Sequence, residues 1–230
     1  MKDNLGNLRR GRFRAIRGQV GYKLPQLLKL RVGLGSGVKE TLFGDDTEVD
    51  ALVYRLYAEA VAGRVGEAEL ARVLEAGGAY ADAIEEAMQA LRRIGRAEAV
   101  QDIFIHADLA RPLARYRLLG RQVVPVFSWF QAALLLWLRG RLQPAHVVEV
   151  AEACLAEAGL DEVALAGLVQ DLLRRRRITR EEVERLLEEA PGLAPVQPAI
   201  RTAGERLGRI PPQAPHRDPP DFLAFLRAAS

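Results

Sequence analysis

The sequence predicts a mixed α/β fold, in which a sheet of few strands is followed by a mostly α-helical carboxy-terminal extension. Short apolar runs bounded by turn-forming or polar residues indicate the strands. Elsewhere apolar residues recur at steps of three and four, which is the period of an amphipathic helix. With 230 residues, 49% of them apolar, the chain is long enough to bury a core without disulfides.

The first predicted element is a helix that follows Leu24. Pro25 suits the first turn of a helix, and Gly33 ends the apolar pattern. A short buried strand is expected at Thr41–Phe43, closed by Gly44. The remaining elements of this half are helices over residues 49–60, 67–75 and 80–92 and a second strand over residues 100–106.

A third strand is predicted at residues 123–127, at a sheet edge because Pro125 cannot donate a ladder hydrogen bond. Ser128 is expected to cap a buried helix over residues 129–138, with Trp129 in the core. This apolar stretch is shorter than the ~20 residues that span a bilayer. Since the start of the chain also lacks the apolar core of a signal peptide, we expect a soluble cytoplasmic protein.

The rest of the chain is predicted to be helical, with Thr179 and Glu182 forming a capping box. The predicted helices of this part cover residues 147–158, 160–176, 180–189, 199–207 and 221–227. The resulting organisation is a basic arm (1–22), a partial α/β region (23–142), a helical region (143–208), and a proline-rich linker with a short terminal helix (209–230).

The charge is unevenly distributed along the chain. The formal net charge is +3, yet residues 1–23 carry seven basic residues against Asp3, so the rest of the chain is net acidic. This arm has few aromatic residues for base stacking, so nucleic acid is not the expected partner. A single cysteine, Cys154, excludes an internal disulfide, and we expect it to be an inert core thiol.

One segment carries residues suited to chemistry. Asp45, Asp46 and Asp50 follow the first predicted strand, at the end where open α/β sheets bind ligands. Carboxylates at this spacing can converge on Mg²⁺, which prefers oxygen ligands. A second interpretation stays open at this point, in which Asp45 or Asp46 only caps the following helix.

Lys23 precedes this segment, which gives the order lysine, helix, apolar strand, G-D-x-x-x-x-D, helix. The order resembles the second half of haloacid-dehalogenase-like (HAD) phosphohydrolases. It is most similar to the phosphatidate phosphatase catalytic domain of actin-patch proteins and of many bacterial proteins. There the acidic loop reads like G-D-S-G-x-x-D-x-x-I-Y, onto which Gly44, Asp45, Asp50 and Tyr54 fall. The resemblance covers about residues 20–108.

The resemblance implies a partial Rossmann-like sheet and a Mg²⁺-dependent phosphatase that acts on a phosphate monoester. Lys23 would then neutralise the phosphate, while Asp45, Asp50 and Asp46 are the candidate metal ligands. The implied partner is a phosphorylated small molecule or lipid. His106, at the end of the second strand, is either a general base or a structural histidine.

The sequence departs from the family in one important way. The family's nucleophilic aspartate lies in a D-x-D motif upstream of the lysine, and residues 1–22 contain no such motif. We therefore expect this chain to be inactive alone, either as the carboxy-terminal part of a longer protein or as a degenerate relative. A different hypothesis is a non-catalytic helical interaction module whose basic arm binds an anionic partner.

Overall fold

The computed structural model describes residues 19–46, 49–108, 112–157, 159–205, 216 and 219–228. Most of the predicted basic arm and most of the proline-rich linker therefore lie outside the described residues. The chain divides into two compact units, Met1–Pro125 with Pro215–Ser230, and Val126–Ala214. The predicted organisation placed residues 126–142 with the α/β region, whereas here they belong to the second unit.

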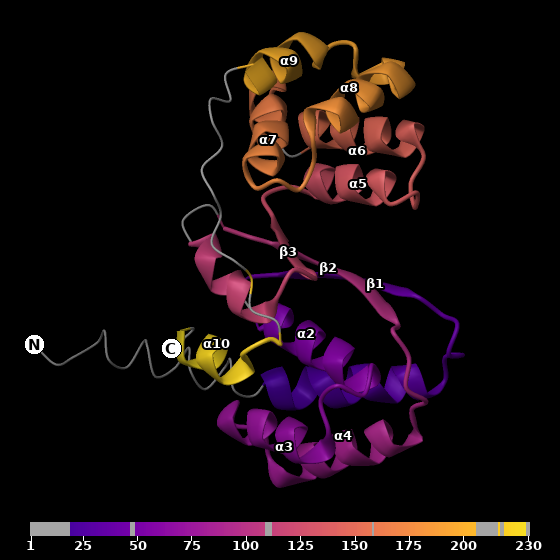
Figure 1. Ribbon diagram of the computed structural model, residues 1–230, viewed down its shortest axis with the longest axis vertical. Coiled ribbons are helices and arrows are strands. Elements are labelled where there is room, and N and C mark those ends of the chain that lie inside the picture. The colour runs from indigo at the N-terminus through magenta and orange to yellow at the C-terminus, as the bar shows by residue number, and fades with distance from the viewer. Residues whose placement is uncertain are drawn as a thin grey trace, which may run out of the picture. The chain divides into compact units, whose positions relative to one another are not determined.

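The first unit contains a small sheet with the order β1-β2-β3 (Figure 1). β1 (Glu40–Asp45) pairs in parallel with β2 (Val100–His106), and β3 (Val123–Val126) lies on the other side of β2. All three predicted strands are therefore confirmed. β3 is an edge strand of the described sheet, as Pro125 indicated.

The prediction that the first strand is buried was wrong for Phe43, whose side chain is 47% exposed. Successive side chains of a strand point to opposite faces. Leu42 accordingly packs against the core of the first unit, while Phe43 stacks on Phe104 of the neighbouring strand, with ring centroids 5.5 Å apart.

Helices lie below this sheet in Figure 1. In this view α2 is drawn closest to the sheet, followed by the indigo helix, residues 19–32, and then by α3 and α4. The helices of this unit that have defined bounds are α2 (Asp50–Val61), α3 (Glu67–Ala76), α4 (Ala81–Arg93) and α10 (Phe222–Ala228). A 3-10 helix, η1 (Leu113–Leu119), precedes β3 and was not predicted.

Pro25 does not lie in the first turn of its helix, contrary to the prediction, because residues 19–32 are all helical. Val20, Leu24 and Leu28 recur at four-residue steps, and all three are fully buried. This apolar stripe continues the helix upstream of the proline, since packing of one face offsets the hydrogen bond that proline cannot donate.

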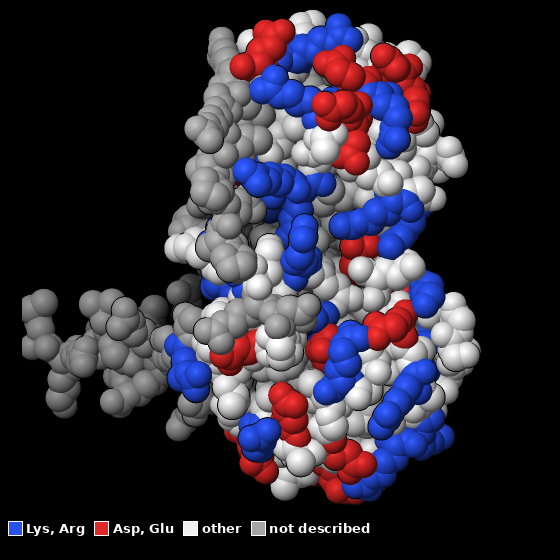
Figure 2. Space-filling view, viewed as in Figure 1, with Lys and Arg blue, Asp and Glu red and all other residues white. Residues whose placement is uncertain are grey.

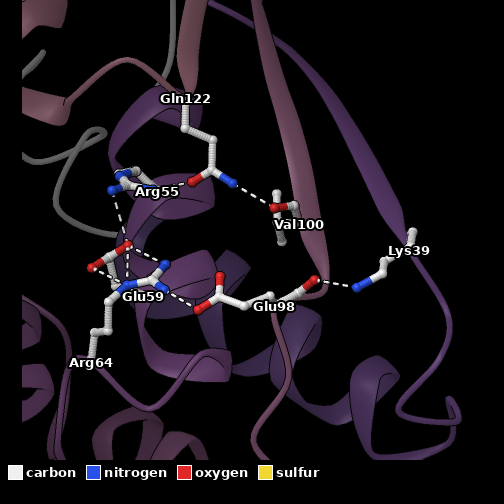
Figure 3. A network of polar contacts seen from close by, with 7 residues as sticks. All are labelled: Lys39, Arg55, Glu59, Arg64, Glu98, Val100 and Gln122. Carbon is white, nitrogen blue, oxygen red and sulfur yellow. Dashed lines mark hydrogen bonds and ion pairs between the residues drawn. The ribbon is translucent and has the colours of Figure 1, made fainter. Parts of the chain in front are cut away.

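A polar network holds together the segments that lead into the strands (Figure 3). Glu59 of α2 accepts hydrogen bonds from Arg64 at 2.8–3.0 Å and pairs with Arg55 at 2.9 Å. Arg55 donates to Gln122, whose amide donates to the Val100 carbonyl at 2.5 Å. Hydrogen bonding to Glu59 raises the pKa of Arg64. The network ties α2 to the amino ends of β2 and β3.

The second unit is helical in its described part. Its elements are α5 (Trp129–Leu138), α6 (Pro144–Ala156), α7 (Glu162–Arg174), α8 (Arg180–Glu189), η2 (Pro191–Leu193) and α9 (Gln197–Glu205). The caps at Ser128 and Thr179 are confirmed, since each hydroxyl accepts a backbone N–H. Trp129 is 42% exposed, which corrects its expected place in the core. Among the described residues, none of the helices combines the length and apolar character needed to cross a bilayer.

Candidate functional site

The predicted site residues lie at the carboxyl ends of β1 and β2. Asp45 is the last residue of β1, and Asp50 is the first residue of α2. Asp45 is paired in register with His106, the last residue of β2. Since parallel strands end at the same edge of a sheet, the loops that follow β1 and β2 meet there. We call this region the carboxyl edge.

Lys23 and Asp50 meet at the carboxyl edge, although they are 27 residues apart. The Lys23 Nζ lies 2.5 Å from Asp50 Oδ1, and the Asp50 side chain is only 7% exposed. The other carboxylate oxygen of Asp50 accepts the backbone N–H of Asp45 at 3.2 Å. Asp50 also stands in the first turn of α2, where the helix dipole stabilises a negative charge. An ammonium group, an amide and a helix terminus thus compensate this buried carboxylate.

Gly44 permits this arrangement by having no side chain. A Cβ at this position would lie 2.5 Å from Asp50 Oδ2 and 2.8 Å from Cε2 of Tyr54, closer than real Cβ contacts allow. The Tyr54 hydroxyl donates to the carbonyl of Phe43 at 3.1 Å. The start of α2 therefore lies directly against the end of β1, and only glycine leaves room for that approach.

Asp46 joins the loops that follow the two strands. Its N–H donates to the carbonyl of His106, and its carboxylate accepts the N–H of Asp108, both at 3.0 Å. Arg115 of η1 lies 3.7 Å from the same carboxylate oxygen. Val49 stands at the N-cap of α2, so neither Asp45 nor Asp46 occupies the position that the capping interpretation gave them.

A second cluster fixes the other end of the Lys23 helix. Arg31, which is 2% exposed, donates to the carbonyls of Val38 and Gly35 at 3.1 and 3.2 Å and lies 3.4 Å from Glu40. The Tyr57 hydroxyl donates to Glu40 at 2.9 Å. Burial raises the pKa of Tyr57, and the hydrogen bond to Glu40 raises it further. The helix that carries Lys23 is thus held at one end by Arg31 and at the other by Asp50.

The carboxyl edge contains two buried carboxylates, those of Asp46 and Asp50. Lys and Arg are interspersed with Asp and Glu over the face drawn in Figure 2, so neither sign dominates that face. The buried carboxylates among the described residues are Asp46, Asp50, Glu59 and Asp102. Two of these four lie in the loop and helix start that follow β1, where the sequence predicted ligand chemistry.

The predicted metal ligands Asp45, Asp46 and Asp50 all lie at the carboxyl edge. Among the described residues, no group of three or more His, Cys, Asp or Glu side chains is placed to hold a metal ion. Asp45 is exposed, and its N–H bonds to Asp50, so these two carboxylates share the edge. Mg²⁺ commonly takes one or two carboxylates and completes its shell with water and phosphate oxygens. Both carboxylate oxygens of Asp50 already accept hydrogen bonds, from Lys23 and from the Asp45 N–H, so a Mg²⁺ site at Asp45, Asp50 and Asp46 stays a prediction.

Other predicted residues have different outcomes. Cys154 is buried, as expected, with its sulfur 3.3 Å from the Ser128 hydroxyl. His106 lies at the carboxyl edge with an exposed side chain, and neither of its two interpretations is tested. Sequence reasoning missed Arg115, because the 3-10 helix that carries it has no 3.6-residue apolar period.

Comparisons of the chain with protein-family models, with curated proteins and with solved structures gave no match. The function of the carboxyl edge must therefore be inferred from its residues.

Proposed function

We propose that the carboxyl edge binds Mg²⁺ and the phosphate group of a monoester, as one part of a HAD-like phosphatase. The observation that carries this proposal is the ion pair between Lys23 and Asp50 at the end of β1. The Lys23 ammonium can bind an anion. The Asp50 carboxylate and the exposed Asp45 carboxylate next to it can bind a cation. The order of lysine, strand, G-D-x-x-x-x-D and helix supports the same proposal.

Each residue has a defined part in this proposal. Asp45 and Asp50 hold the cation, and the Lys23 ammonium interacts with phosphate oxygens as a compact point charge. Bound Mg²⁺ supplies electrostatic stabilisation of the charge on the phosphoryl oxygens. Because Lys23 already neutralises Asp50, a phosphate dianion can approach the acidic loop with less repulsion. The proposed ligand is a phosphorylated small molecule or lipid.

Turnover needs a further group in this proposal. The sequence contains no D-x-D motif, so none of its aspartates matches the family's nucleophile. A carboxylate from outside this sequence would attack phosphorus and displace the alcohol of the monoester, and water would then hydrolyse the acyl phosphate to inorganic phosphate. We therefore expect the chain to bind phosphate without hydrolysing p-nitrophenyl phosphate, and phosphate binding is the property to measure.

The test is calorimetric titration of the chain with inorganic phosphate, in the presence and absence of Mg²⁺. We expect binding that requires Mg²⁺ and that is lost in Lys23→Met and in Asp50→Asn. Lys29→Met is the matched control, because Lys29 lies on the same helix and pairs with Glu86 at 2.7 Å on the exposed surface. The proposal fails if the unaltered chain does not bind phosphate with Mg²⁺, or if Lys23→Met binds it as well as Lys29→Met does.

A further inference from the structure

A second basic side chain, Arg115, lies at the carboxyl edge, near Asp46. Lys23 contacts Asp50, which follows this loop, whereas Arg115 approaches Asp46, which begins it. The Arg115 side chain is partly buried, with 22% of its surface exposed. One ammonium and one guanidinium group thus lie near the two described ends of this loop, Asp50 and Asp46.

The two basic groups are engaged differently. Lys23 Nζ lies 2.5 Å from its carboxylate, but the nearest approach of Arg115 to Asp46 is 3.7 Å, beyond hydrogen-bonding distance. Asp46 is instead hydrogen-bonded through the N–H of Asp108 at 3.0 Å. The guanidinium therefore compensates the buried Asp46 at longer range and is not fixed by that carboxylate.

Aromatic side chains hold Arg115 in position. Its guanidinium donates to the Tyr116 hydroxyl at 2.8 Å and lies over the rings of Tyr116 and Phe225, 4.8 and 6.0 Å from their centroids. Both rings are buried. Stacking on aromatic faces fixes the plane of a guanidinium while leaving its edge available to an anion.

The supporting ring of Phe225 comes from the far end of the chain. It belongs to α10, which joins η1 through the hydrogen bond from the Asp221 N–H to the Leu118 carbonyl, at 2.7 Å. Phe225 and Tyr116 pack with ring centroids 6.4 Å apart. The carboxy-terminal helix thus contributes to the placement of a basic group at the carboxyl edge.

We propose that Arg115 is a second phosphate-binding residue of this edge and that Phe225 is its positioning residue. This inference rests on the proposed function, because the anion is the same phosphate group that Lys23 binds. A guanidinium presents N–H groups in a planar fork that matches two phosphate oxygens, which an ammonium cannot do. Lys23 and Arg115 together would offset the charge of a phosphate dianion.

The test is the affinity for inorganic phosphate at saturating Mg²⁺, measured by calorimetry on the full chain. We expect Arg115→Met to weaken binding by about tenfold, since a hydrogen-bonded charge pair is lost. Arg115→Lys keeps the charge but loses the fork, so its affinity should fall between those of Arg115→Met and the unaltered chain. Arg117→Met removes the same charge from the same 3-10 helix and should leave the affinity unchanged.

Phe225→Ala tests the positioning role. We expect it to weaken phosphate binding less than Arg115→Met does, and to add nothing when the two substitutions are combined. An independent, merely structural effect on the affinity would instead add to that of Arg115→Met. An additive result overturns the role of Phe225.

The outcomes separate this inference from the proposed function. If Lys23→Met abolishes binding while Arg115→Met stays within twofold of the unaltered chain, the role of Arg115 is overturned and the proposed function stands. If Arg115→Met does not fold, as judged by its melting transition, Arg115→Lys decides, and an unchanged affinity overturns the role. Absence of Mg²⁺-dependent phosphate binding in the unaltered chain overturns both.

Discussion

The two ends of the small sheet use charged residues in opposite ways. At the amino ends of β2 and β3, Glu59 is enclosed by two arginines, and the network continues through Gln122 to the backbone (Figure 3). At the carboxyl edge, Asp45 is exposed and the Arg115 guanidinium stays 3.7 Å from Asp46. The first end, which we call the closed end, encloses its buried carboxylate with two arginines, whereas the second leaves one carboxylate, that of Asp45, exposed to solvent.

Helix α2 connects these two ends. Its first turn supplies Asp50 to the carboxyl edge, and its last turns supply Arg55 and Glu59 to the network. A buried charge is stabilised only when its partners surround it, so the closed end is suited to fixing the helix. This contrast predicts that substitutions at the amino end lower stability and that substitutions at the carboxyl edge change binding.

The largest expected effect is that of Glu59→Gln. This substitution keeps the size of the side chain but leaves Arg55, which is 8% exposed, without its carboxylate. Removing one partner of a buried ion pair costs about 3–5 kcal/mol. The free energy of unfolding from urea titration should fall by about that amount, while phosphate affinity stays unchanged at temperatures where the variant is folded.

Glu98→Gln is the matched control at the same end. Glu98 also pairs with Arg64, but its side chain is 69% exposed. An exposed pair contributes about 1 kcal/mol or less, because water solvates both groups. Equal losses in the two variants would contradict the claim that enclosure, and not charge pairing alone, stabilises this end.

Tyr57→Phe sharpens the comparison next, because Tyr57 anchors Glu40 just before the exposed part of β1. The hydrogen bond from Tyr57 to Glu40 is one to a charged group, and such a bond contributes about 1.5–3 kcal/mol. At pH 7 the substitution should lower the free energy of unfolding by that amount. The raised pKa of Tyr57 also predicts a pH dependence. Above about pH 10 the unfolded phenol loses its proton while the folded one keeps it, so the stability of the unaltered chain falls as pH rises.

Urea titrations at pH 7 and near pH 11 measure this difference. The difference in the free energy of unfolding between the unaltered chain and Tyr57→Phe should be smaller at the higher pH. Only the unaltered chain has the Tyr57 hydroxyl, whose contribution to stability falls as pH rises. A gap that stays constant would show that Tyr57 does not keep its proton in the folded state.

Local signals predicted much of this fold. The strands β2 and β3, the caps at Ser128 and Thr179, and the helices of both units follow from apolar spacing and capping residues. Gly44 and the acidic loop could also be predicted, because the G-D-x-x-x-x-D spacing lies within one short stretch of the sequence. These elements depend on interactions within a few positions of the chain.

Long-range contacts could not be predicted from the sequence. Arg55 and Gln122 are 67 residues apart, and no local pattern pairs them. The helical turns before Pro25 depend on tertiary packing, which overrides a local proline signal. The resemblance placed Lys23 and Asp50 at one site, but with a phosphate between the ammonium and the cation, and it did not predict their direct ion pair.

Gly44→Ala tests the carboxyl edge. We expect a smaller loss of stability than in Glu59→Gln, together with weaker phosphate binding. The added Cβ would meet Asp50 and Tyr54 at less than 3 Å, so α2 must shift, at a cost of about 1–3 kcal/mol. The shift would also move Asp50 away from Lys23 and weaken Mg²⁺-dependent phosphate binding. Gly35→Ala is the control, because nothing lies within 4 Å of its added Cβ. Unchanged phosphate affinity in Gly44→Ala would refute the placement of the site at the end of β1.

The smallest expected effect is that of Tyr54→Phe, which removes the hydrogen bond to the Phe43 carbonyl at the carboxyl edge. This bond is exposed, so water can replace the hydroxyl, and we expect a loss of about 0.5–1.5 kcal/mol in urea titration. Asp50 keeps its bonds to Lys23 and to the Asp45 N–H, so phosphate affinity should change little. Tyr80→Phe, at a 79% exposed position, is the control and should have no effect. A loss as large as that of Tyr57→Phe would contradict the contrast, because it would mean that the carboxyl edge is held as firmly as the closed end and is not accessible to a ligand.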